Sequence, residues 1–221
     1  MLKRLYKSAL ELADNPEAVD VVCYIDDDDS SYSGLKLPQL TKVFGPRVVL
    51  SKMWNRCFEE AKGDILHHCG DDIIFRTKGW DTKVREAFSA DDDRIVFVYG
   101  SDGNGDSERN QFGTHGFIHR NWVNVVGYFV PPYFVSDYND TFLNDLAKKL
   151  GRHRYIDILT EHMHYSLGKM PVDQNTKDRL ARHEKERPDM LYNSVEFQAE
   201  IETKREALQE FINENRDSRT R

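Results

Sequence analysis

The sequence predicts an α/β domain built around a mostly parallel sheet. Short β-branched runs alternate with segments that carry apolar residues at helical spacing, and polar loops follow the strand-like runs. In open parallel sheets, ligands bind outside the carboxyl ends of the strands. Two acidic clusters, Asp26–Asp29 and Asp71–Asp72, follow such runs. We therefore expect the functional site at that edge of the sheet.

The first half of the predicted domain has clear local signals. Residues 2–13 carry apolar side chains at helical spacing and stop before Pro16. Residues 19–25 form a short, nearly continuous β-branched run, which predicts a strand buried on both faces. Residues 47–50 predict a second strand. A helix is expected from about Ser51, its predicted N-cap, to Lys62.

The second half continues the alternation. Residues 65–69 and 94–99 predict strands, and residues 80–88 predict the helix between them. Residues 141–150 form a further helix that ends before a glycine. Beyond these, residues 177–215 are charged and helix-prone.

The organisation predicted is one domain over residues 1–172 and a C-terminal helical extension over residues 173–221. The extension carries an amphipathic apolar stripe, which must be covered by another surface. Two alternatives remain open at this level: the flank of the same domain, or a second copy of the chain in a homodimer.

Composition narrows the classes of partner. The formal net charge of −7 argues against tight, sequence-independent binding to a polyanion, although a local basic patch could still meet nucleic acid. No apolar run approaches the roughly 20 residues that span a bilayer, so no membrane insertion is expected. Cys23, Cys57 and Cys69 are odd in number and widely spaced, which indicates reduced thiols and favours the cytoplasm.

The stretch from Glu59 to Asp72 resembles glycosyltransferase family 2, including its small phage-type members. In that family a helix ending in Ala-x-Gly-Asp leads into a strand and an Asp-x-Asp metal motif, and a Gly-Trp pair follows, here Gly79-Trp80. Residues 21–27 are similar to the family's second strand, and residues 116–129 to its acceptor-side segment.

This resemblance implies a GT-A fold, which is Rossmann-like, and transfer of a sugar from a nucleoside-diphosphate sugar, in particular a UDP-sugar, to a hydroxyl acceptor. It also implies Mn²⁺ or Mg²⁺, cations that need only one or two carboxylates beside the phosphates. Asp71 and Asp72 are the expected metal ligands. His162 or His164, which alternate on one side of an extended segment, is expected to complete the metal shell. An ordinary acidic turn is the alternative for the aspartates.

The remaining site residues follow from the same resemblance. Asp137 stands where the family keeps its catalytic base, and Asp140 is the alternative base. A helix N-cap is the non-catalytic interpretation of either carboxylate. Asp26 or Asp27 is expected to contact the nucleotide, and Asn55 matches a polar helix position near the donor.

The sequence also departs from the family. Cys69 replaces the first metal-motif carboxylate, and Ser136 replaces the glutamate before the base. The strand and arginine-containing loop that open the family's chain have no counterpart here, so we expect a version extended by one strand to be more stable. A nucleotidyltransferase, or a non-catalytic binding or assembly protein on a degenerate GT-A scaffold, are the rival functions. Some small phage-type relatives modify DNA bases, which makes a modified base one candidate acceptor.

Overall fold

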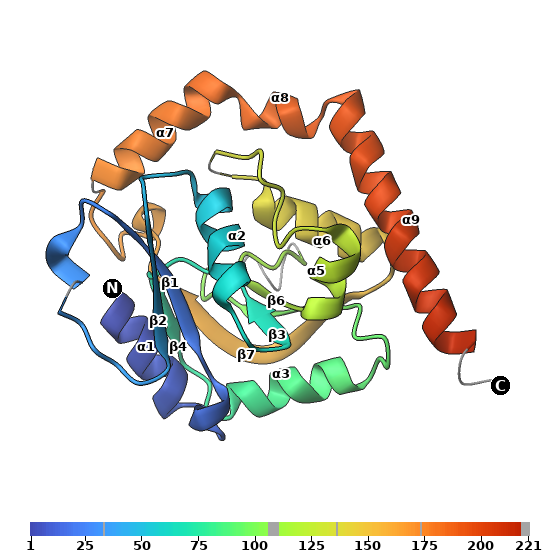
Figure 1. Ribbon diagram of the computed structural model, residues 1–221, viewed down its shortest axis with the longest axis horizontal. Helices are drawn as coiled ribbons and strands as arrows, with labels where there is room; N and C mark the ends of the chain where they lie inside the picture. Colours follow the sequence, from blue (N-terminus) through green and yellow to red (C-terminus); the bar gives the residue numbers. More distant parts are fainter. Residues whose placement is uncertain (33, 106–110, 136, 173, 218–221) are drawn as a thin grey trace.

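The computed structural model describes residues 1–32, 34–105, 111–135, 137–172 and 174–217, and its architecture is α/β (Figure 1). The strands are β1 (Val21–Asp26), β2 (Leu40–Gly45), β3 (Ile65–His67), β4 (Ile73–Phe75), β5 (Phe97–Ser101), β6 (Gly116–His119) and β7 (His153–His162). The α-helices are α1 (Leu2–Glu11), α2 (Leu50–Glu60), α3 (Trp80–Ser89), α5 (Arg120–Val126), α6 (Asn139–Lys149), α7 (Gln174–Glu186), α8 (Pro188–Tyr192) and α9 (Val195–Asp217).

The described strands form two sheets, so the expected single, mostly parallel sheet is wrong. β1 and β2 make a parallel pair, and the other five strands lie in the order β3-β6-β5-β7-β4. Within that larger sheet only β5 and β7 are parallel, while β6 and β4 run antiparallel to their neighbours. The difference arises from β4 and β6, two strands of three and four residues that are too short to give a clear sequence signal.

The long strand β7 joins the two halves of the larger sheet. Its first part pairs with β5, and its last three residues pair with β4. Figure 1 shows β7 as a curved ribbon that passes under the middle of the molecule. The end of β7 therefore lies beside the segment that leads into β4.

The region before α2 differs from the prediction. The strand is β2, over residues 40–45, and residues 47–50 are not a strand. Val49 is the N-cap of α2, so the predicted N-cap role of Ser51 is wrong. Ser51 lies in the first helical turn, fully buried, and its hydroxyl donates to the carbonyl of Phe134 at 2.7 Å. This hydrogen bond links α2 to the loop that contains Phe134.

Strand β5 and the residues before it divide the core between the two faces of the sheet. Ile95, Phe97 and Tyr99 belong to one cluster, and Val96 and Val98 belong to the other, as alternation along an extended chain requires. The first cluster is covered by α5, α6 and α9, and the second by α1 and α3. Helices thus cover both faces of the larger sheet.

Helix α9 covers the flank of its own chain. Phe197, Ile201, Leu208 and Ile212 are nearly inaccessible to solvent and belong to the same core cluster as Trp122 of α5. The chain's own core therefore covers this part of the amphipathic stripe, whereas Leu180, Leu191 and Val195 of the same stripe are exposed. None of the helices in the described ranges is long and apolar enough to cross a membrane.

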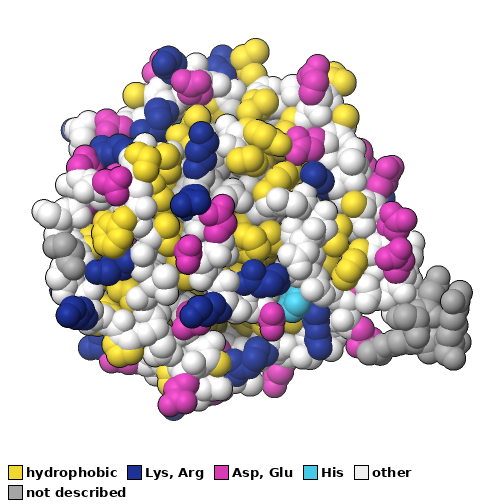
Figure 2. Space-filling view, viewed as in Figure 1, with side chains coloured by type: hydrophobic (Ala, Val, Ile, Leu, Met, Phe, Trp, Pro, Cys, Tyr) yellow, Lys and Arg dark blue, Asp and Glu magenta, His cyan; other side chains and the backbone are white. Residues whose placement is uncertain are grey.

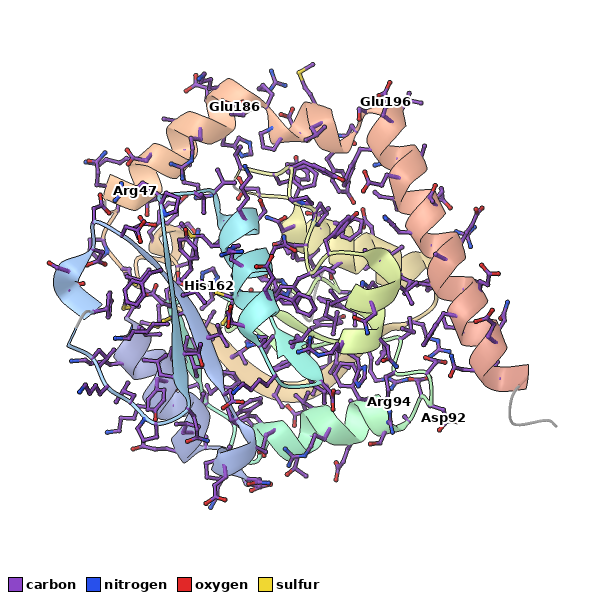
Figure 3. All side chains as sticks on the ribbon, in the orientation of Figure 1. Arg47, Asp92, Arg94, His162, Glu186 and Glu196 are labelled. Atoms are coloured by element: carbon purple, nitrogen blue, oxygen red, sulfur yellow. The ribbon has the colours of Figure 1, made fainter. Side chains whose placement is uncertain are left out.

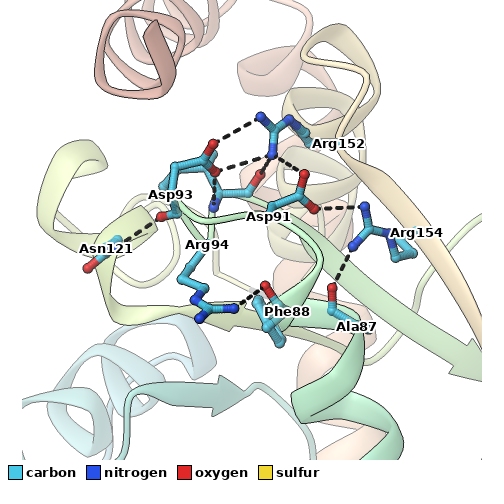
Figure 4. A network of polar contacts seen from close by, with 9 residues as sticks. Ala87, Phe88, Asp91, Asp93, Arg94, Asn121, Arg152 and Arg154 are labelled. Atoms are coloured by element: carbon cyan, nitrogen blue, oxygen red, sulfur yellow. Dashed lines mark hydrogen bonds and ion pairs between the residues drawn. The ribbon is translucent and has the colours of Figure 1, made fainter. Parts of the chain in front are cut away.

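An ion-pair network fixes the start of β7 against the loop between α3 and β5 (Figure 4). Arg152 pairs with Asp91 at 2.7 Å and with Asp93 at 3.0 Å, and Arg154 pairs with Asp91 at 2.7 Å. Asp93 is 5% exposed, and Asn121 donates to its carbonyl at 3.0 Å. Because Asp93 is buried, its ion pair with Arg152 offsets the cost of removing the carboxylate from water.

Candidate functional site

A cavity of about 1720 Å³ lies between β1, β3, the end of β7, and helices α1, α2, α3 and α7. Seven of the predicted site residues line it: Asp26, Asp71, Asp72, Asp137, Asp140, His162 and His164. Asp27 and Asn55 are not among the lining residues. Figure 2 shows acidic, basic and apolar side chains interspersed on the face seen in Figure 1, so neither charge sign dominates that face.

The closest contact between predicted metal ligands joins Asp72 and His162. Residue 162 pairs with Ile73 at the end of the β4–β7 ladder, and the backbone N–H of Met163 donates to the carbonyl of Asp72 at 2.9 Å. These backbone bonds bring His162 Nε2 to 3.1 Å from Asp72 Oδ2. In Figure 3, His162 lies in the middle of the molecule, while Glu186 and Glu196 lie on its outer rim.

The two aspartates of the acidic turn have different electrostatic environments. Burial opposes ionisation of Asp72, but its hydrogen bond and electrostatic interaction with His162 outweigh that effect, so the pKa of Asp72 is lowered. Burial raises the pKa of Asp71, and the amino group of Met1 partly opposes that shift. Gly70 leaves space for the turn, because a Cβ there would lie 2.5 Å from Asp72 Oδ1.

Two further histidines adjoin His162. The ring centroid of His164 lies 4.9 Å from that of His162, and His164 Nδ1 lies 2.6 Å from the hydroxyl of Ser166. The ring of His115 meets His162 edge-on, with centroids 4.6 Å apart, and burial lowers the pKa of His115 well below its ordinary value. Sequence reasoning missed His115, because its glycine-rich surroundings gave no periodic signal.

The donor atoms of the cavity offer few ligands for a metal ion. Within the described residues, no group of three or more His, Cys, Asp or Glu side chains is arranged to hold one. Asp72 and His162 instead form a pair of one carboxylate and one imidazole. The carboxylate suits Mn²⁺ or Mg²⁺ when phosphate oxygens supply further ligands, and the imidazole suits a transition-metal ion better than Mg²⁺.

Asp137 lies at the side of the cavity and is ion-paired to helix α7. Arg179 Nη1 lies 2.7 Å from its Oδ1, and His183 Nδ1 lies 2.5 Å from its Oδ2. Arg179 also donates to the hydroxyl of Tyr165 at 3.0 Å. Both oxygens of the predicted base are therefore in contact with one helix. Ser136, the predicted departure from the family, lies outside the described residues.

Asp140 lies in the first turn of α6, where its Oδ1 accepts from the backbone N–H of Thr141 at 2.8 Å. A helix N-terminus ordinarily favours the ionised carboxylate. Here burial dominates and raises the pKa of Asp140 to about 6. A carboxyl with that pKa can both accept and return a proton near neutral pH.

Of the three residues predicted to contact the nucleotide, Asp26 lines the cavity, and Asp27 and Asn55 do not. Asp26 ends β1 at the cavity, and its Oδ2 accepts from Arg47 Nε at 3.0 Å. Asp27 is exposed. Asn55 donates to the carbonyls of Ser51 and Val130, each at 2.8 Å, and accepts from the Phe129 N–H at 2.9 Å. The Asn55 amide therefore links α2 to the loop around residue 129.

The three cysteines carry free thiols and all line the cavity. Burial raises the pKa of Cys23 to about 11 and that of Cys57 and Cys69 to about 12. Thiols with raised pKa values are poor nucleophiles at neutral pH. Carboxylates and histidines are therefore the candidate acids and bases of the cavity.

No model of a known protein family matches the chain, and no curated protein matches it.

Proposed function

We propose that this protein is a metal-dependent glycosyltransferase with a GT-A-type active site, which moves a sugar from a nucleoside-diphosphate sugar to a hydroxyl group. The observation that carries the proposal is the Asp72–His162 pair, which lines a cavity that Asp26, Asp137 and Asp140 also line. Two carboxylate positions at strand ends, an imidazole and a nearby base are the parts that such a reaction needs.

In this proposal, Asp72 and His162 hold Mn²⁺ or Mg²⁺, with Asp71 and His164 next to them. The cation would stabilise the negative charge that develops on the leaving diphosphate. The end of β1, with Asp26, would face the nucleoside. Arg179 and Arg182 of α7 are among the cationic residues that line the cavity. Their guanidinium groups match phosphate geometry.

In this proposal, a carboxylate at the start of α6 removes the proton from the acceptor hydroxyl. Asp137 is the first candidate, and its contacts with Arg179 and His183 orient the carboxylate. Asp140 is the second candidate, because its raised pKa suits proton exchange near pH 6. The acceptor would enter between these residues and the metal pair.

The proposal is tested by titrating UDP and UTP into the protein with Mn²⁺ and with EDTA, followed by a UDP-release assay with UDP-sugars. We expect Mn²⁺-dependent UDP binding that weakens by roughly 10- to 100-fold in Asp72→Asn and in His162→Ala. Glu196→Gln on the outer rim is the matched control and should bind as the parent does. Preference for UTP would favour a nucleotidyltransferase. Metal-independent binding, or equal affinity in all variants, would contradict the proposed site.

A further inference from the structure

Two asparagines of helix α6 are buried, and they differ in their hydrogen bonds. Asn144 is fully buried, and its Oδ1 accepts from the backbone N–H of Gly113 at 2.7 Å. Its Nδ2 donates to the carbonyls of Gly113 and Asp140, at 2.9 and 2.8 Å. His153 Nε2 lies 2.8 Å from the same Oδ1. The protein itself therefore satisfies the Asn144 amide on both of its atoms.

The amide of Asn139 has no such partners. Asn139 is the first residue of α6 and is 2% exposed. Neither its Oδ1 nor its Nδ2 has a hydrogen-bond partner among the described residues. A buried amide in this state destabilises the fold, because it gives up its bonds to water and gains none. Proteins keep few such groups, and a ligand that supplies the missing partners is one reason to keep them.

The backbone just before Asn139 has an unusual conformation. Tyr138, the N-cap of α6, has a φ of 74°, a left-handed value that is rare for a bulky side chain. Its ring stacks on that of Tyr192, with the centroids 5.0 Å apart. Strained backbone of this kind is concentrated at functional sites, where the surrounding packing maintains it. Asn139, which follows this turn, lines the cavity together with Asp137 and Asp140.

The surroundings of the Asn139 amide select the chemistry of its ligand. The amide has one acceptor oxygen and two N–H donors, so its ligand must both donate and accept. The carboxylates of Asp137 and Asp140 accept from hydroxyl donors and, as anions, favour a neutral ligand over an anionic one. Phe129 and Val135, from the loop before α6, add apolar surface to the cavity. A neutral ring that carries several hydroxyl groups, as a sugar does, matches these features.

We propose that Asn139 binds a neutral sugar acceptor, and that its amide hydrogen-bonds the hydroxyl group next to the one that receives the transferred sugar. This inference rests on the proposed glycosyl transfer and names the acceptor class of the same site. Asp137 and Asp140 flank Asn139 in the chain, so a ring held by the amide presents its adjacent hydroxyl group to the wall that carries both candidate bases. An acceptor that lacks the matching hydroxyl leaves the buried amide unpaired, which gives specificity.

The first test compares the melting temperatures of Asn139→Leu and Asn144→Leu, two matched variants of one helix. Asn144→Leu should lower Tm by at least about 4 °C, because it removes the bonds to buried groups described above. Asn139→Leu should keep or raise Tm, because it removes a buried amide that has no partner. An equal loss of Tm in the two variants would show that the Asn139 amide is structural, and would overturn the inference.

The second test observes the amide directly, by NMR of ¹⁵N-labelled protein with Mg²⁺ and UDP present. The Nδ2 resonances of Asn139 are assigned by their absence from the spectrum of Asn139→Leu. The methyl glycosides of glucose, galactose and mannose are the probes, and cyclohexanol, a ring with a single hydroxyl group, is the control. We expect at least one glycoside to shift the Asn139 resonances, whereas cyclohexanol leaves them in place. The Asn144 resonances should not move with any of the probes, because that amide is bonded within the protein.

The outcomes separate this inference from the proposed function. Asn139→Leu should raise the KM for the glycoside that shifts the amide by at least about tenfold, and should leave the Mn²⁺-dependent affinity for UDP unchanged. Mn²⁺-dependent UDP binding with an amide that no probe shifts would overturn the sugar site alone. Metal-independent UDP binding with a shifted amide would contradict the glycosyl transfer and support the sugar site. A shift that appears only with an oligodeoxynucleotide of hydroxymethylated bases would overturn the sugar class.

Discussion

His162 Nε2 lies 3.1 Å from Asp72 Oδ2, although 90 residues separate the two along the chain. The contact depends on the pairing of β4 with the end of β7 and on the Met163 N–H that donates to the Asp72 carbonyl. Backbone bonds thus place both side chains before any ligand arrives. Such pre-positioning lowers the cost of binding a cation, since fewer side-chain rotamers must be fixed.

We predict that Gly70→Ala weakens Mn²⁺-dependent UDP binding with little loss of stability. A Cβ at this position would lie 2.5 Å from Asp72 Oδ1, so the Asp72 carboxylate must turn away from His162. The expected loss in affinity is roughly tenfold, measured by calorimetry. Gly63→Ala is the matched control, because its nearest new contact would be 3.5 Å. Equal affinity in both variants would show that the orientation of Asp72 is irrelevant to binding.

We predict that Asp137→Asn abolishes turnover but preserves UDP affinity. A general base acts in the chemical step, so kcat should fall by roughly 100-fold or more. UDP-release kinetics give kcat, and equilibrium titration gives the affinity.

The alternative base makes a different prediction. If Asp140 carries the proton, Asp140→Asn is the inactive variant, and kcat/KM of the parent rises with pH through about 6, the raised pKa of that carboxyl. Full activity in both variants would exclude Asp137 and Asp140 as the catalytic base.

We predict that the folded state loses stability as pH falls from about 6.5 toward 4. Burial lowers the pKa of His67 to about 3 and that of His68 to about 4, so the unfolded chain binds protons that the folded chain excludes. Their stabilising contribution is complete above the unfolded pKa of about 6.5 and is lost below it. Asp140, whose folded pKa is raised, acts in the opposite direction between about pH 4 and 6.

Urea unfolding at several pH values measures this dependence. His68→Gln should flatten the curve relative to the parent, because one buried titrating ring is removed. The imidazole proton resonances of His67 and His68 should not titrate above about pH 5 in the folded protein. Titration near 6.5 would mean that the rings are hydrated.

We predict that Arg152→Ala destabilises the fold by about 3–5 kcal/mol, because it leaves the buried Asp93 carboxylate without its cation. The matched control is Arg56→Ala. Arg56 pairs with Glu59 at 2.6 Å, but both side chains are more than half exposed. Its loss should change the free energy of unfolding by less than about 1 kcal/mol. Similar losses in the two variants would show that the burial of Asp93 has no energetic effect.

The sequence predicts the helices better than the sheet. Helices α1, α3 and α6 begin and end within about two residues of the expected positions, since apolar periodicity and end signals act locally. The strand expected at residues 47–50 lies instead at residues 40–45, where alternation is weak. A short strand such as β4 is stabilised by its pairing with β7. Pairing between segments that are distant in the chain gives no local sequence signal.

The candidate site is also predictable only in part from the sequence. The acidic turn after β3, the end of β7 and the start of α6 all lie at one cavity, and seven of the predicted residues line it. Asn55 was selected by resemblance alone, and its amide is bonded to backbone. Arg179 and His183 reach Asp137 from α7, 42 and 46 residues away, and only tertiary packing brings them there.

The contact between α7 and Asp137 has a consequence for how the cavity opens. No described side chain of α7 is fully buried, so the helix is attached by charged groups rather than by an apolar seam. Such attachments weaken with added salt, whereas apolar seams do not. Departure of α7 would therefore follow ionic strength, and the same event would release the Asp137 carboxylate to its next partner. If α7 departs in this way, access to the cavity and release of the Asp137 carboxylate would follow the same dependence on salt.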